Sequence, residues 1–279
     1  MEAGQGIAAA ELRPLSLGEL LDRTFTLYRN HFWLFVGLMA VPYSLVLALS
    51  LLIQGLSAAG PDIGMAAIAG AGLLMLVFFL ALIIVFGLTQ AATIFALSEV
   101  YLGRSTTIRE TYSRIWGDIG RVIFVQILVS LGIFVGIILL IVPGIWFALR
   151  AAVSIPVAII EDLQAGDAVR RSMELTKGFT GRVALIFLLM LIISWVAAFV
   201  LQFPFMLAAF AYAASGKTVP YWLNMISSVA DTVANVLAGP LGIIAFSVLY
   251  FDLRVRKEGF DLKVMMDRLS VPTPRAPFA

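Results

Sequence analysis

Six long stretches of this chain contain almost no charged side chain, and this feature limits its fold more than any other. A run of about 18 or more apolar residues is long enough to cross the hydrocarbon core of a bilayer as an α-helix. Lipid offers no partner to bare backbone groups, so such runs form helices whose hydrogen bonds are internal. The sequence therefore predicts an all-α integral membrane bundle of six transmembrane helices, with spans at about 32–56, 66–98, 122–142, 145–160, 183–213 and 223–251.

The composition agrees with this class. Apolar residues make up 61% of the 279 residues and charged residues only 13%, whereas a soluble domain carries about 25% charge because water surrounds it. The chain has no Cys, which excludes disulfides and thiol chemistry. Its net charge of +2 is too small to suggest nucleic acid as a partner.

The basic residues predict the orientation. Of 19 Lys and Arg residues, 17 fall in segments on one side of the six expected spans, while the opposite loops hold only Lys217 and the fourth span holds Arg150. Transfer of Lys and Arg across the membrane is disfavoured, so the basic side faces the cytoplasm. We therefore expect a multi-pass protein of the cell membrane with both termini cytoplasmic and outer turns near Pro61, Gly144 and Lys217.

Segments of helical periodicity lie between the spans on the basic side. They are expected as amphipathic helices at about 16–30, 107–120, 167–178 and 261–269, and the first three each precede a pair of spans, which predicts three similar hairpin units. Ser16 with Glu19, and Thr107 with Glu110, have the spacing of a capping box. We expect a single membrane domain over 16–269, a flexible N-terminus over 1–15 and a disordered tail over 270–279.

These helices carry basic residues on one face and apolar residues on the other, which suits the headgroup layer of anionic lipid. The alternative is that they pack only on the ends of their own spans. The candidate lipid-interface residues are Arg23, Arg29, Arg109, Arg114, Trp116, Arg170, Arg171, Lys177, Arg254, Arg256 and Lys257.

Three stretches taken together carry a family resemblance: LSLGELLDRTFTLYRNHFWLFVGL near the start, IVPGIWFALRAAVSIPVAIIEDLQAGDAVRRSMELTKGF in the middle and LYFDLRVRKEGFDL near the end. With them the chain resembles the membrane domain of bacterial glycerophosphoryl diester phosphodiesterases, a domain that also occurs alone. The resemblance implies a membrane topology and assigns no chemical role to these motifs. The fused enzymes of that family add a soluble hydrolase domain, which these 279 residues do not contain.

Catalysis and cofactor binding have no support in the sequence. His31 is the single histidine, so a pair of acid and base histidines cannot form, and no Cys is present to complete a ligand set. We expect a protein that is not an enzyme and takes no cofactor or metal.

Polar residues inside the expected spans are the remaining candidates. Arg150 and Asp231 come out at similar distances from the outer turns, so they either pair between the fourth and sixth spans or reach lipid phosphate and water separately. Asn224, Ser228, Asp231 and Asn235 share one face of the sixth span, where they either join helices or line a solute path.

Two functions follow from these patterns. The first is a non-catalytic membrane protein that organises anionic lipid or holds partner proteins at its cytoplasmic face, with a homo-oligomer as a further possibility. The alternative is a transporter or permease for a small solute or lipid, with a polar site around Arg150 and Asp231.

Overall fold

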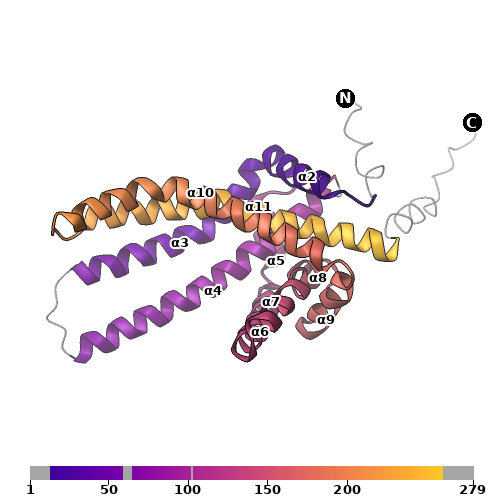
Figure 1. Cartoon of the computed structure of the whole chain (residues 1–279), viewed down its shortest axis with the longest axis horizontal. Helices are drawn as coiled ribbons and strands as arrows, with labels where there is room; N and C mark the ends of the chain where they lie inside the picture. Colours follow the sequence, from indigo (N-terminus) through magenta and orange to yellow (C-terminus); the bar gives the residue numbers. More distant parts are fainter. Residues whose placement is uncertain (1–12, 59–64, 102, 260–279) are drawn as a thin grey trace, which may run out of the picture.

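The computed structural model describes residues 13–58, 65–101 and 103–259. The described residues form ten α-helices and no strand, and six of their segments are long and apolar enough to cross a membrane. Four long helices lie roughly alongside one another (Figure 1): α3 (Phe32–Ala58), α4 (Met65–Tyr101), α10 (Thr180–Ala214) and α11 (Tyr221–Glu258). The all-α prediction is therefore confirmed for the described residues, and six apolar helical segments able to span a membrane lie near the six expected positions.

The fourth expected span is broken, and its turn differs from the prediction. Helix α6 (Ile119–Leu139) ends three residues before residue 142, where the third span was expected to end, and α7 (Ile141–Arg150) begins directly after Leu140. Pro143 was interpreted as part of the turn, but proline is tolerated in the first turn of a helix because those N–H groups have no helical partner. Residues 151–153 then separate α7 from α8 (Ser154–Ile160).

Close backbone contact holds α6 and α7 together as a hairpin. A Cβ on Gly136 would stand 2.7 Å from the Cα of Gly144, and one on Gly132 would meet the Phe147 ring at 2.4 Å. Small residues spaced four apart allow helices in lipid to approach this closely. The tip of this hairpin, Leu139 to Val142, is apolar and exposed.

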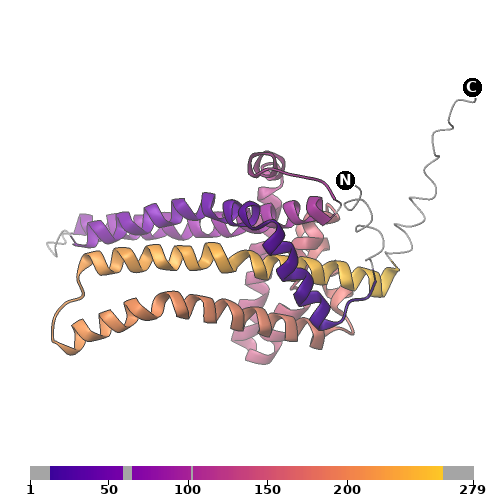
Figure 2. The same ribbon diagram turned by 90° about the horizontal axis from the view of Figure 1, so that it is seen from above.

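Short helices gather at one end of the bundle, which we call the charged end. It consists of α2 (Leu17–Asn30), α5 (Ile108–Ile115), α8, α9 (Ala165–Thr176) and the C-terminal turns of α11. Figure 2 shows α2 crossing α11 there. The opposite end, where α10 turns into α11 at residues 215–220, is the far end.

Both expected capping boxes are present. The Ser16 and Thr107 side chains accept from the backbone N–H of Glu19 and Glu110, whose carboxylates accept in return from the capping residues' own N–H groups. The helix expected at 107–120 is shorter than predicted: α5 ends at Ile115, and a turn through Trp116 and Gly117 leads into α6. Gly259 ends α11 in the left-handed conformation, with φ 57°.

The buried core lies in the half of the bundle nearest the charged end. It contains Phe35 and Leu38 of α3, Leu97 of α4, Ile186 of α10 and Tyr250 of α11. Helix α11 is central to it, because it contacts α2, α3, α4, α8, α9 and α10. By contrast, exposed apolar side chains dominate the far halves of α4 and α10.

Some sequence predictions fall outside the described residues. These are residues 1–12 of the N-terminus expected to be flexible over 1–15, the outer turn at Pro61, the fourth interfacial helix at 261–269 and the tail at 270–279.

Candidate functional site

Six of the ten cations expected at the lipid interface divide into two groups. Arg171, Arg254 and Arg256 are bound by carboxylates inside the charged end. Arg29, Arg109 and Arg114 are exposed on α2 and α5, and within the described residues none of these three has a carboxylate partner at ion-pair distance. The first group holds the fold together, and the second remains accessible to an external ligand.

Asp252 is the centre of the first ion cluster. Its side chain is completely buried, and it pairs with Nε of Arg182 at 3.0 Å and with Nε of Arg256 at 3.0 Å. It also accepts the Leu15 N–H at 2.8 Å, while both arginines donate to the Leu15 carbonyl. One aspartate thus joins the segment before α2, the start of α10 and the end of α11.

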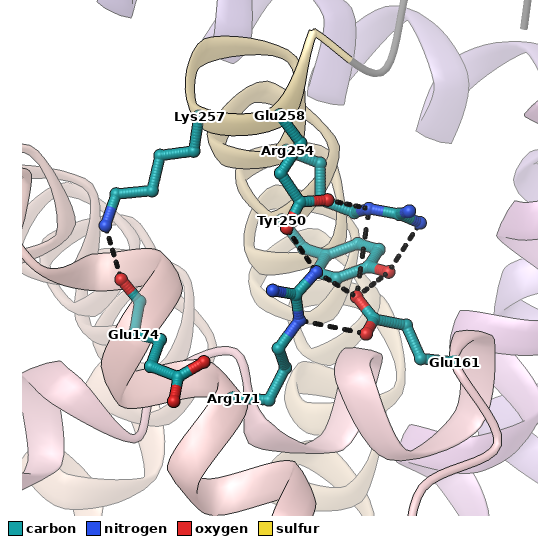
Figure 3. A network of polar contacts seen from close by, with 7 residues as sticks. All are labelled: Glu161, Arg171, Glu174, Tyr250, Arg254, Lys257 and Glu258. Atoms are coloured by element: carbon teal, nitrogen blue, oxygen red, sulfur yellow. Dashed lines mark hydrogen bonds and ion pairs between the residues drawn. The ribbon is translucent and has the colours of Figure 1, made fainter. Parts of the chain in front are cut away.

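Glu161 and Glu258 form a second cluster, drawn in Figure 3. Arg171 of α9 reaches both carboxylates, and Arg254 pairs with Glu258 at 3.2 Å. The Tyr250 hydroxyl donates to Glu161 at 2.9 Å. Burial lowers the pKa of Arg171, but hydrogen bonds and charges from Glu161 and Glu258 more than reverse this, so its pKa stands above the ordinary value.

Lys257 belongs to neither cluster. Its ammonium group donates to the backbone carbonyl of Glu174 at the end of α9, and the Glu174 carboxylate points elsewhere (Figure 3). Arg170 makes an exposed pair with Asp167, at 3.3 Å. Arg23 lies over the Tyr101 ring, and Lys177 is exposed at the end of α9.

Two tyrosines fasten the short helices to the spans. The Tyr28 hydroxyl donates to the Leu237 carbonyl at 2.7 Å, and the Tyr112 hydroxyl donates to the Leu38 carbonyl. Burial raises the pKa of both hydroxyls. Helices α2 and α5 therefore do pack on the long helices, but α2 is fastened to the middle of α11 and α5 to α3, and not only to the ends of the spans that follow them, as the alternative to a headgroup position supposed.

The accessible faces of the same helices carry tryptophan as well as arginine. Trp116 at the end of α5 is 70% exposed, and Trp33 at the start of α3 is 81% exposed. They lie beside Arg114 and Arg29 in the chain. Exposed indole rings next to basic residues are typical of the boundary between membrane and water.

The structure does not bring Arg150 and Asp231 together. The Arg150 carbonyl accepts from Ser172 at 2.9 Å and from Thr176 at 3.1 Å, so Arg150 lies against α9 at the charged end, with its guanidinium over the Trp146 ring. Asp231 is exposed in the far half of α11 and accepts from Asn235. The pair was one of two alternatives for these residues, and the structure does not form it, because α7 ends at Arg150 and does not continue as the straight span from Gly144 that the comparison of depths assumed.

The polar face of α11 is only partly used. Ser228 accepts from Gln54 of α3 at 2.8 Å, which is a contact between helices, and Asn235 donates back to Asp231 on its own helix. Asn224, Asp231 and Asn235 are exposed. A neighbouring contact joins Gln202 of α10 to Ser227 at 3.0 Å.

A cavity of about 460 Å³ lies between the spans. Side chains from α3, α4, α6, α7, α8, α10 and α11 line it, among them Tyr43 and Phe246. Its polar members include Gln90 and Gln126, which hydrogen-bond to each other across α4 and α6 at 3.3 Å. The sequence shows these glutamines as buried polar groups but does not reveal that they meet.

Sequence reasoning missed Asp252, Glu161 and Arg182 as the residues that hold the charged end together. One signal was available for Asp252, since it stands four residues before Arg256 at the end of a long apolar run. No group of three or more potential metal ligands occurs in the part of the chain that the structure describes. His31 lies edge-on to the Phe35 ring, at a centroid distance of 6.4 Å.

Comparisons with known proteins give no family for this chain: no family model, curated protein or solved structure matches it.

Proposed function

We propose that the protein is a non-catalytic module of the cell membrane that organises anionic lipid around its charged end. One observation carries this proposal: exposed Trp33 and Trp116 share that end with exposed arginines that have no carboxylate partner among the described residues. Indole rings favour the headgroup level, and guanidinium groups bind phosphate. The half-buried arginines of the two ion clusters stabilise the charged end, from which these side chains project.

The orientation belongs to the same proposal. Leu15 binds Asp252, so the segment before α2 and the end of α11 lie together at the charged end. Basic residues gather at this end, and Lys217 lies at the other. We assign the charged end to the cytoplasmic face on the rule that basic loops are retained inside.

The arrangement in the membrane completes the proposal. Helices α2, α5 and α9 each precede a hairpin of two membrane segments, and their exposed faces lie in the headgroup layer. Membership of the phosphodiesterase membrane-domain family is proposed only on the three stretches that resemble it. Protein partners or self-association at the exposed apolar faces are compatible with this arrangement, whereas the permease site around Arg150 and Asp231 is not assembled.

Native mass spectrometry of the detergent-solubilised protein with added phosphatidylglycerol tests the headgroup role. A basic residue near an anionic surface contributes about 1 kcal/mol, so the double variant Arg109→Gln, Arg114→Gln loses about 2 kcal/mol and should retain phosphatidylglycerol roughly thirtyfold less well. Lys217→Gln at the far end is the matched control and should retain it normally. Equal retention by all three proteins would contradict the proposal.

A further inference from the structure

The cavity between the spans lies at the depth of lipid acyl chains. Gly239 and Phe246 line it and precede Asp252 by 13 and 6 residues, or about 20 and 9 Å at ~1.5 Å per residue. The hydrocarbon core is about 30 Å thick, so a single leaflet accounts for about half of this. Measured from Asp252, the cavity therefore begins within the leaflet nearest the charged end and extends past the middle of the bilayer.

The lining offers little to a polar ligand. Met39, Ile94, Ile133, Phe187 and Phe246 give it a mainly hydrocarbon surface. The polar atoms are largely engaged elsewhere: the Thr89 hydroxyl donates to the Val85 carbonyl at 2.8 Å, and the two glutamines bind each other. A desolvated polar solute would lose its water without gaining equivalent hydrogen bonds.

The cavity continues towards the surface between α4 and α6. A second hollow shares Tyr43, Phe86 and Gln126 with it and adds Leu82 and Ser130. Phe86 and Ser130 are exposed. This opening faces sideways at the level of the spans, where the surrounding molecules are lipids.

We propose that this cavity holds one acyl chain of a membrane phospholipid, which enters between α4 and α6. Its volume lies within the range of ligand pockets, about 300–1,000 Å³. The lateral opening selects a lipid already in the bilayer. This proposal goes beyond the proposed headgroup role, because the cavity and the exposed arginines of α2 and α5 are separate sites. Either proposal can therefore be contradicted without the other.

Gly242 gives a direct way to fill the cavity. It lines the cavity, and a Cβ built on it meets nothing within 4 Å, so Gly242→Leu extends into open space. The matched control is Gly72→Leu on the exposed surface of α4, where a Cβ also meets nothing within 4 Å. Ala148→Leu fills the same cavity from α7 and serves as a second variant.

The probe is phosphatidylglycerol with a photoactivatable diazirine in the middle of one acyl chain, added to the full chain in nanodiscs. Adducts mapped by mass spectrometry should include cavity residues such as Met39 and Phe187. Gly242→Leu should reduce these adducts at least fivefold without lowering the melting temperature, and Gly72→Leu should leave them unchanged. Should Gly242→Leu fail to fold, Ala148→Leu must give the same loss.

Three results would overturn the inference. Adducts confined to outward residues such as Phe199 and Val200 would show ordinary lipid contact only. Unchanged cavity adducts in both filling variants would show that the chain binds elsewhere. A diazirine fatty acid that labels the cavity, when the phospholipid does not, would show a free fatty acid as the occupant.

Discussion

The two ends of the bundle are held together in different ways. At the charged end, buried apolar residues surround two ion clusters that connect α9, α10 and α11 with the segment before α2. At the far end, the described hydrogen bonds between side chains of different helices are few, such as Gln54 with Ser228 and Gln202 with Ser227. The cohesion of the protein is therefore concentrated at one end.

The solvent explains this difference. Water at the charged end drives apolar burial, and carboxylates can fix arginines there. Lipid tails are as apolar as the helices themselves, so burial gives no comparable drive within the membrane, and helices there associate through packing and hydrogen bonds. A membrane protein can therefore fix its helices at one boundary and leave their other ends less tightly joined.

The largest expected effect comes from Asp252. Asp252→Asn leaves Arg182 and Arg256 without their shared buried carboxylate, which should lower the free energy of unfolding by about 3–5 kcal/mol. Unfolding titrations in mixed micelles measure this change. Asp231→Asn, an exposed aspartate in the far half of the same helix, is the control and should change stability by less than about 0.5 kcal/mol. Equal losses at the two positions would remove the contrast between the ends.

A smaller effect is expected from the far-end contact of Gln202 with Ser227. Hydrogen bonds between membrane helices average about 0.6 kcal/mol, so Ser227→Ala should cost about that amount. The same titrations measure it, and Ser215→Ala, whose hydroxyl binds only its own helix at Ala211, is the control. A loss above about 2 kcal/mol would mean that the far end is as firmly joined as the charged end.

The smallest effect is expected for the coupling of Arg150 and Asp231. Arg150 lies against α9 and Asp231 in the far half of α11, so the losses from Arg150→Leu and Asp231→Leu should add within about 0.5 kcal/mol. A double-mutant cycle measures the coupling. If the double variant instead recovered stability, Arg150 and Asp231 would interact, contrary to the structure.

Much of the fold could be predicted because lipid makes apolar length the main signal. The first span was expected at 32–56 and is found at Phe32–Gly55, and both capping boxes follow from local spacing alone. The turn after α6 was misplaced because proline and glycine mark turns but also occur in a first helical turn. Periodicity did not show that α5 stops at Ile115.

The candidate site was harder to predict, because periodicity identifies the face of a helix and not the helix that meets it. Arg254 and Arg256 belong to the same basic run as Lys257, but the structure turns two of the three towards internal carboxylates. Leu15 and Asp252 are 237 residues apart, and no local pattern connects them. The cavity likewise depends on how seven helices meet.

The contact of Leu15 with Asp252 also determines when, during synthesis, the charged end can assemble. A ribosome adds about 5–20 residues per second during synthesis, so 237 residues of separation correspond to a delay on the order of tens of seconds. During that time the early spans must remain in the bilayer without α11, the helix that contacts most of the others. The contacts of the charged end therefore form late, when α11 is inserted next to helices that were synthesised before it.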